Sequence, residues 1–177
     1  MNTVQTISPV KPTQELIDHW PEIRQLFRRA IKKNTYVSLA TVRPDGTPHV
    51  SPVGSFFLND DCTGFYLEKF TTAVQKNGPA NRQVTVMGVD PGRWFWLRSV
   101  LKGKFDRYPA IRLYGIAEEK RPATERERER FLRLVRPLKG TKGYKIMWED
   151  MGTTRLIRFT HFEPARLGKM TQELGRR

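Results

Sequence analysis

Apolar residues recur at helical spacing near the start of the chain. Between Leu16 and Ile31 they are separated mostly by three or four positions, which is typical of the buried face of an amphipathic helix. Thr13 can cap this helix with its hydroxyl, and Lys32-Lys33 suits the negative end of the helix dipole. Pro21 cannot donate a backbone hydrogen bond, so we expect two short helices or a kink there.

Beyond the helix, apolar and polar residues alternate with the period of two that is typical of β-strands. The segment Arg43-Pro-Asp-Gly46 predicts a hairpin turn, because proline presets the turn and glycine accepts a positive φ. A second turn is expected at Asn59-Asp-Asp61. The predicted strands cover residues 36–42, 47–57, 64–68, 83–89, 110–119 and 154–163, with a further short strand at 144–148.

Fewer segments have a helical pattern. A short helix is expected over residues 72–77, and a longer one over 125–135, where Thr124 provides a cap and acidic residues occupy the first turn. Residues 94–107 fit either a helix or a strand with a bulge. Several antiparallel strands with few helices predict a mainly β (α+β) fold, a β-barrel with peripheral helices packed outside it.

The length and composition indicate one folded domain. The chain has 177 residues, of which 38% are hydrophobic, enough to bury a core. We expect a flexible N-terminal lead over residues 1–12, a single domain over 13–165 and a basic tail over 166–177. No apolar run approaches the ~20 residues that cross a bilayer, the first residues do not resemble a signal peptide, and Cys62 is the lone cysteine. The expected location is therefore cytoplasmic, with no membrane partner.

The chain is strongly basic. Its 32 Lys and Arg residues exceed its 18 Asp and Glu residues by 14. Such a charge suits a nucleic-acid-binding protein, but a protein that binds a small phosphorylated cofactor needs only a few of these cations. The basic residues are spread along the chain, and no helix-turn-helix, zinc-finger or aromatic RNA-binding pattern accompanies them. A small-molecule ligand is the favoured interpretation, and a non-catalytic nucleic-acid-binding or regulatory barrel is the alternative.

Most motifs that carry catalytic chemistry are absent from the sequence. It contains no G-x-G-x-x-G dinucleotide fingerprint and no G-x-x-x-x-G-K-[ST] phosphate loop. G-x-S-x-G, H-E-x-x-H and C-x-x-C are also missing. The three histidines, His19, His49 and His161, have no ligand spacing, so no metal site is expected. No catalytic acid or base stands out, which is typical of proteins whose cofactor supplies the reactivity.

The hairpin over residues 38–53, with its sequence Ser-Leu-Ala-Thr-Val-Arg-Pro-Asp-Gly-Thr-Pro-His-Val-Ser-Pro-Val, resembles a known family. It is similar to the opening of the FMN-binding split-barrel family related to pyridoxamine 5′-phosphate oxidase. The later segment Lys69-Phe-Thr-Thr72, the step Lys76-Asn77 and the strand Val84-Thr-Val-Met87 extend this resemblance. It covers about residues 15 to 120.

The resemblance implies a six-stranded antiparallel split β-barrel that forms a homodimer, with FMN held in a groove between the subunits. It implies an FMN-dependent oxidoreductase that acts on a small-molecule substrate; the deazaflavin F420 and haem are alternative cofactors. Carried onto this chain, the flavin and its ribityl group would face His49, Val50, Ser51 and Pro52. The phosphate would lie in the segment that contains Lys69, Phe70, Thr71, Thr72 and Lys76, where cations and hydroxyl donors meet.

This chain departs from the family pattern at three places. Glu68 adjoins the expected phosphate site, where a carboxylate is unfavourable unless it points to the opposite face. Residues 77–82 contain an insertion. The segment that recognises pyridoxal in the true oxidase has no counterpart near residues 162–167. Pyridoxamine phosphate is therefore not the expected substrate.

Overall fold

The computed structural model describes residues 11–69, 81–148 and 151–176. The helix predicted over residues 72–77 lies outside these ranges. The elements in chain order are α1 (Gln14–Asn34), β1 (Val37–Val42), β2 (Pro48–Val53), β3 (Phe56–Leu58), β4 (Thr63–Leu67), β5 (Gln83–Val89), α3 (Arg93–Lys102), β6 (Ala110–Ala117), β7 (Arg121–Pro122), α4 (Glu125–Val135), the 3₁₀ helix η1 (Arg136–Leu138), α5 (Lys142–Trp148), β8 (Thr153–Pro164) and the 3₁₀ helix η2 (Gly168–Arg176).

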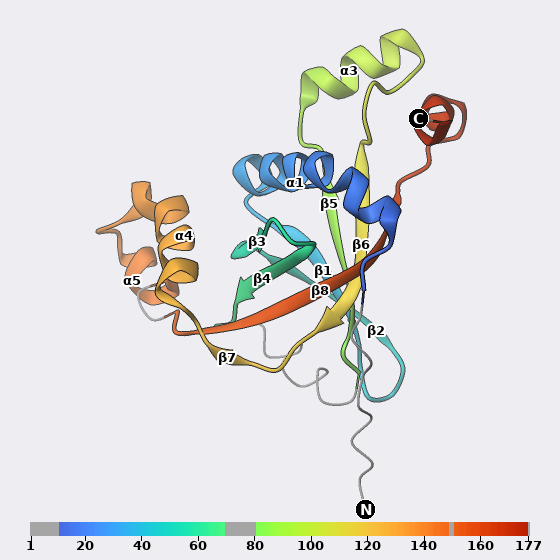
Figure 1. The fold of residues 1–177 in the computed structure, drawn as a ribbon. Helices are drawn as coiled ribbons and strands as arrows, with labels where there is room; N and C mark the ends of the chain where they lie inside the picture. Colours follow the sequence, from blue (N-terminus) through green and yellow to red (C-terminus); the bar gives the residue numbers. More distant parts are fainter. Residues whose placement is uncertain (1–10, 70–80, 149–150, 177) are drawn as a thin grey trace, which may run out of the picture.

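A curled antiparallel sheet forms the centre of the fold, and helices lie around it (Figure 1). Hydrogen-bonded neighbours follow the order β2-β1-β5-β6-β8-β4-β3, and β7 pairs with β8 off this path. The predicted fold class, a mainly β split barrel with peripheral helices, is confirmed. The described residues form eight strands rather than the six expected.

The strand expected over residues 47–57 is divided in two, which raises the count. The break falls at Gly54 and Ser55, and it sends β2 and β3 to opposite ends of the strand order. A Cβ atom at Gly54 would lie 2.7 Å from the backbone oxygen of Thr35, so the chain passes closely beside the end of α1 at this point. The Ser55 hydroxyl donates to the carbonyl of Leu67 at 2.9 Å. These contacts are distant in sequence, and the alternation of residue types does not reveal them.

Helix α1 covers the inner face of the sheet and runs through Pro21 as one helix. The expected division into two helices is wrong, because apolar side chains on both sides of Pro21 are buried in the same core, among them Leu16 and Leu26. Thr13 caps the helix as predicted, by accepting from the Leu16 N–H. The sheet approaches α1 closely at Gly88, where a Cβ atom would lie 2.9 Å from Leu26 Cδ2.

The carboxylate of Asp90 joins β5 to two helices. Its side chain is 1% exposed and accepts from Arg29 Nε of α1 at 2.9 Å and from Arg107 Nε at 3.1 Å. The Gly92 N–H, at the start of α3, donates to the other oxygen at 3.0 Å. Burial opposes ionisation, but the Gly92 N–H and the guanidinium groups of Arg107 and Arg29 outweigh it and lower the pKa of Asp90.

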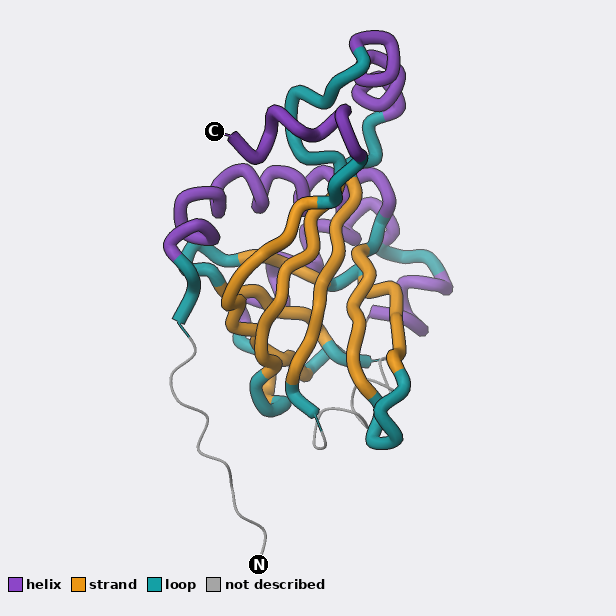
Figure 2. Tube along the Cα trace, turned by 90° about the vertical axis from the view of Figure 1, so that its right-hand side faces the viewer, coloured by secondary structure: helices purple, strands orange, loops and turns teal. Residues whose placement is uncertain are grey.

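Residues 93–102 form a helix, α3, rather than a strand with a bulge. Gly103 ends it in the left-handed region with φ +69°, a conformation that favours glycine. Trp96 turns inward and donates to the Asp90 carbonyl at 2.8 Å, whereas Trp94 is 82% exposed. In both views α3 lies beyond α1 next to the C-terminal η2 (Figures 1 and 2), and the Tyr108 hydroxyl donates to the Leu174 carbonyl at 3.0 Å.

Residues 142–148 form helix α5 and not the predicted short strand. The Thr141 hydroxyl accepts from the Tyr144 N–H at 3.1 Å and caps the helix. Tyr144 and Trp148 are four residues apart, and their rings pack edge to face on the same side of the helix. The ring of Trp148 also contacts that of Phe131 on α4. Packing against α4, which is distant in sequence, decides the conformation here.

Helix α4 matches its prediction in extent and capping. Thr124 and Glu127 form a reciprocal capping box, and Arg121 holds the Glu127 carboxylate with two hydrogen bonds of 2.9 and 2.7 Å. In the part of the chain that the structure describes, no helix combines the length and the apolar character needed to cross a membrane.

Candidate functional site

The hairpin turn fixes the start of β2, the strand predicted to face the flavin. Gly46 adopts φ +85°, the left-handed conformation that the turn prediction required. The Asp45 carboxylate accepts from the backbone N–H of Thr47 at 2.9 Å and from its hydroxyl at 2.7 Å. These hydrogen bonds lower the pKa of Asp45. The turn therefore sets the register of β2 on β1, which pairs Ala40 with Val50.

A chain of polar side chains runs along one face of β2. Arg43 Nη2 lies 3.1 Å from His49 Nδ1, and His49 Nε2 lies 3.0 Å from Ser51 Oγ. A guanidinium group only donates, so Nδ1 of His49 is the acceptor and Nε2 carries the proton. His49 then donates to Ser51, which leaves the Ser51 hydroxyl hydrogen for a further acceptor. Two of the four predicted β2 residues are thus joined directly to each other.

The backbone of Val50 faces the edge of the sheet, where no strand of the described residues pairs with the outer side of β2. Alternate residues of an antiparallel pair direct both backbone polar groups toward or away from the neighbouring strand. The Arg43 N–H donates to the Thr47 carbonyl at 2.9 Å, so Thr47 directs its backbone groups toward β1. Ser51 lies four residues after Thr47, an even number, and therefore does the same. Val50 lies three residues after Thr47, an odd number, and therefore directs its N–H and C=O away from β1. Its side chain is 60% exposed.

Pro48 and Pro52 occupy positions equivalent to Val50 on β2. Proline has no N–H, so these two residues lose no hydrogen bond to β1 where the strand faces outward. Prolines on a sheet edge also prevent continuous pairing with another strand. In the antiparallel pairing, the N–H of Val50 is the outward-directed donor between the two prolines.

A groove of about 420 Å³ crosses the outer face of the sheet beside Pro48. Its walls include Ala40 and Val42 of β1 and Thr85 of β5. Tyr114 of β6 and His161 of β8 form the far side, with their rings stacked at 4.6 Å and 3°. Arg43, Tyr114 and His161 were not predicted as site residues. The alternation of β6 indicates that Tyr114 points to one face, but the strand register that places His161 beside it depends on a β-bulge at Tyr114/Gly115.

Lys69 follows β4 and is half-buried. Because all the pairings are antiparallel, the first residue of β2 and the last residue of β4 lie at the same end of the strands. The two strands are nevertheless not neighbours in the sheet. Strand pairing within one chain therefore does not join Lys69 to the β2 residues. The other residues predicted for the phosphate site, Phe70, Thr71, Thr72 and Lys76, lie outside the described residues.

Glu68 points into the barrel and not toward a phosphate. Its side chain is 0% exposed, and Oε1 accepts from Arg155 Nε at 2.8 Å and from the Tyr66 hydroxyl at 3.0 Å. Arg155 also donates to the Glu118 carbonyl at 2.9 Å. Burial and the adjacent Glu68 carboxylate raise the pKa of Tyr66 well above its usual range. Arg155 compensates the negative charge of Glu68 inside the fold. This agrees with the expectation that a carboxylate next to the proposed phosphate site points to the opposite face.

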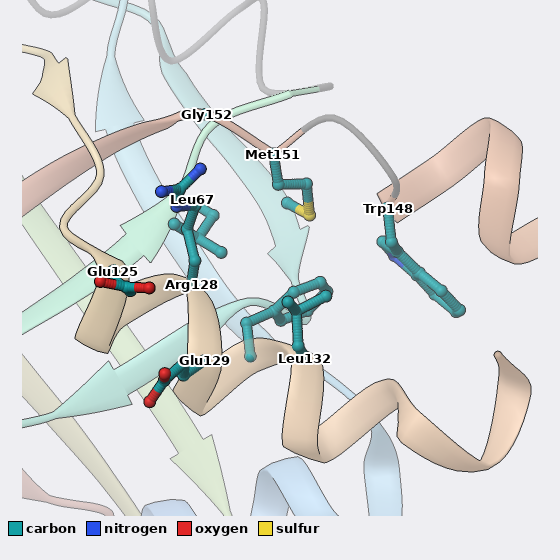
Figure 3. Close-up of a pocket in the computed structure, with 9 residues that line it drawn as sticks. Leu67, Glu125, Arg128, Glu129, Leu132, Trp148, Met151 and Gly152 are labelled. Atoms are coloured by element: carbon teal, nitrogen blue, oxygen red, sulfur yellow. The ribbon is translucent and has the colours of Figure 1, made fainter.

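A second cavity of about 240 Å³ lies between α4, the end of α5 and the end of β4 (Figure 3). Leu67, Leu132 and Met151 provide apolar walls, and Trp148 closes one side. Charged side chains from α4 occupy its rim: Glu125, Arg128 and Glu129. In the part of the chain that the structure describes, no residue lines both this cavity and the groove beside β2.

Comparisons with known proteins agree with this architecture. The family model described as pyridoxamine 5′-phosphate oxidase matches residues 23–145. The structure of HupZ from Group A Streptococcus has a TM-score of 0.54 at 19% identity, covering 84% of this chain and 94% of that one. An FMN-binding protein from Syntrophomonas wolfei has a TM-score of 0.53 at 17% identity, with coverages of 88% and 97%.

A structure named F420 reductase has a TM-score of 0.53 at 22% identity, covering 79% of this chain and 94% of that one. At such identities these three likenesses concern the fold alone. A comparison with curated protein sequences found no significant match.

Proposed function

This chain belongs to the pyridoxamine 5′-phosphate oxidase family, and from that premise we propose that it is a homodimeric, FMN-binding oxidoreductase whose flavin lies along β2. The observation that carries the proposal is the outer edge of β2, which pairs with no described strand and where the N–H and C=O of Val50 face outward between two prolines. The pyrimidine edge of a flavin presents an N–H donor between two carbonyl acceptors. A backbone donor and acceptor on one residue are complementary to part of this edge.

Side chains on β2 support the same placement. The chain from Arg43 through His49 to Ser51 fixes the orientation of the Ser51 hydroxyl, so this donor is available to a ligand oxygen without reorganisation. The exposed side chain of Val50 points to the opposite face of β2 from His49 and Ser51, so it offers an apolar surface to a ring system on the outer face of the sheet. The two faces meet only at the strand edge, where the backbone of Val50 lies. When bound, FMN would supply the electron-transfer chemistry, and the residues of this chain would bind it, orient it and exclude water.

Lys69 is proposed to contact the phosphate, together with the segment that follows it. A cation and hydroxyl donors suit a phosphate dianion, and Glu68 does not oppose them because Arg155 compensates its charge. Since β2 and β4 are not neighbours in the sheet, we place the two halves of the FMN site at an interface. In this arrangement, one subunit supplies β2 and the other supplies the segment after β4.

The outer face of the sheet supports a homodimer. It carries apolar side chains that no described helix covers, including Val50, 60% exposed, and Met87, 38% exposed. The groove beside Pro48 lies on the same face. A second copy packed on this face would bury these side chains and convert the open groove into an enclosed site, as a planar cofactor requires.

The absorbance spectrum of the purified protein tests the cofactor. Oxidised flavin bands are expected in the protein as isolated, or after titration with FMN. A matched pair of variants then tests the role of β2. Val50→Pro removes the outward N–H together with the valine side chain and should weaken FMN binding about 2- to 10-fold, whereas Val50→Ala removes the side chain but keeps the N–H and should have a smaller effect. A colourless protein that gains no flavin signal from FMN would refute the proposal.

The phosphate contact has its own test. Lys69→Ala removes a charge-assisted contact worth about 1.5–3 kcal/mol, so FMN affinity should fall ~10- to 150-fold. Riboflavin lacks the phosphate, and its affinity should hardly change. Equal losses for both ligands would mean that Lys69 shapes the site indirectly.

F420 is a second candidate cofactor, favoured by the structural likeness to an F420 reductase and by the net charge of +14. F420 carries an acidic tail, which basic residues would attract. Reconstitution with FMN, F420 and haem in parallel, followed by absorbance spectroscopy, distinguishes the cofactors. Tight binding of F420 with weak binding of FMN would transfer the proposal to the deazaflavin.

A further inference from the structure

A basic groove of about 590 Å³ lies between α1 and α4 over β3, the strand at the other end of the strand order from β2. Its floor is β3, which connects to β4. Among the described residues, none lines both this groove and either the groove beside β2 or the cavity next to α5. The FMN proposal therefore does not use this groove.

Cations from both helices line the basic groove. Arg24, Arg28 and Lys32 follow one another at intervals of four on α1 and so share a face of that helix. Arg130 and Arg133 of α4 line the other wall. Asp and Glu are absent among the described residues that line it. Arg24 pairs with the carboxylate of Asp60, which does not line the groove, so the uncompensated charge of the groove comes mainly from the other cations.

Arg130 is held in place at the centre of these charges. Its guanidinium donates to Asn59 Oδ1 at 2.8 Å and to the Leu58 carbonyl at 3.0 Å. It also lies 5.1 Å from the ring centroids of Phe57 and Phe65. Both hydrogen-bond partners are neutral, so they orient Arg130 without compensating its charge.

The pKa of Arg130 reports the same imbalance. Burial lowers the pKa of Arg130, and the positive charges of Arg126, Arg24 and Arg28 lower it further, which outweighs the opposing effect of the Asp60 carboxylate. Nearby, Arg24 Nε is buried and has no hydrogen-bond partner among the described residues. A buried donor without an acceptor is unfavourable. Both observations describe a groove that an anion would stabilise.

The floor of the basic groove is apolar. Side chains of Phe27 and Ile31 from α1, the β3 residues and Leu134 from α4 form it. Phe57 is partly exposed and stacks on Phe65 with ring centroids 5.3 Å apart. Such a floor favours a ligand with an apolar or aromatic portion, and the volume is that of a site for one small ligand.

We propose that this groove binds a nucleoside polyphosphate, with the phosphates between Arg28, Arg130 and Arg133 and the base on the apolar floor. A monovalent anion such as a fatty acid would leave most of the cations uncompensated, whereas a nucleoside triphosphate carries about four negative charges. Guanidinium groups bind phosphate oxygens with paired hydrogen bonds. The aromatic base would cover Phe57 and Leu134.

The test is a fluorescence titration of the full chain with N-methylanthraniloyl-ATP, followed by competition with unlabelled ATP. The double variant Arg28→Ala/Arg133→Ala should weaken binding at least tenfold. Arg128→Ala is the matched control, because Arg128 lies on α4 but lines the cavity beside α5. Leu134→Ala tests the apolar floor, and Leu132→Ala, on the other face of α4, is its control.

Competition by parts of the ligand distinguishes the alternatives. Inorganic triphosphate should compete more weakly than ATP, and adenosine more weakly still. Equal competition by ATP and triphosphate would overturn the role of the floor, and stronger competition by laurate or by a single-stranded RNA oligonucleotide would overturn the ligand class. FMN binding, measured by absorbance, should be unchanged in Arg28→Ala/Arg133→Ala. A parallel loss of FMN affinity would identify this groove as the flavin site and refute a separate nucleotide site.

Discussion

Replacing Arg155 by methionine should cost more stability than any exchange of a surface arginine in this protein. Methionine is unbranched and fills most of the same space, but it leaves the carboxylate of Glu68 without its counter-charge. That carboxylate is 0% exposed, and Arg155 is 10% exposed. After the exchange, the Tyr66 hydroxyl is the hydrogen-bond donor that remains to this carboxylate among the described residues, at 3.0 Å.

The magnitude follows from the contacts that disappear. Removing one partner of a buried ion pair costs about 3–5 kcal/mol, because the other charge stays buried and unpaired. The Glu118 carbonyl also loses its 2.9 Å hydrogen bond from Arg155. For a chain of this length, each kcal/mol lowers Tm by roughly 2–4 °C. Arg155→Met should therefore lower Tm by roughly 6–20 °C.

Thermal and urea unfolding of the cofactor-free protein would measure this loss without a contribution from ligand binding. Arg158→Met is the matched control, since Arg158 lies on the same strand and pairs with Glu118, but it is 52% exposed. A surface pair of this kind is worth about 0–1 kcal/mol. The double variant Glu68→Gln/Arg155→Met removes both charges and should recover about 2 kcal/mol of the loss.

Two outcomes would refute this reasoning. If Arg155→Met and Arg158→Met destabilise the protein equally, the charge of Glu68 does not need Arg155. If the double variant is no more stable than Arg155→Met, the loss comes from packing and not from an uncompensated carboxylate.

Two more predictions concern charges and backbone packing. The pKa of Asp90 is lowered in the folded protein, so its ionisation stabilises the fold at pH values above the unfolded-state pKa of about 3.9. The difference in Tm between the wild type and Asp90→Asn should therefore shrink as the pH falls below ~4. A difference in Tm that stays constant with pH would contradict this. A Cβ atom at Gly115 would clash with the backbone oxygen of Arg158. Gly115→Ala should therefore destabilise the protein by about 1–3 kcal/mol in urea unfolding. Gly143 has open space around it, so Gly143→Ala should leave the free energy of unfolding unchanged.

Local features of the sequence determined the turns, the caps and most elements. The Asp45–Gly46 turn and the Thr13 and Thr124 caps occur as predicted, because their hydrogen bonds join residues within four positions of each other. Alternation also predicted most strands, since a half-buried strand places every second residue in the core. The family resemblance located β2, whose residues His49 and Ser51 are joined in the structure.

Elements that depend on distant packing could not be predicted in this way. The pattern of residues 144–148 predicted a short strand, but contact between Trp148 and the ring of Phe131 on α4 stabilises residues 142–148 as a helix. The strand expected over 47–57 divides where it passes the end of α1. In both cases a contact across the fold outweighs the local preference, which is small compared with the free energy of burying an aromatic side chain.

Charge provides the clearest contrast between sequence and structure. The sequence shows a net charge of +14 but distributes its basic residues along the chain. Only the fold brings Arg28 of α1 and Arg133 of α4 to one groove over β3, and only the fold places Glu68 beside Arg155 and away from solvent. Electrostatic energy depends on distance and burial, and both are properties of the tertiary structure.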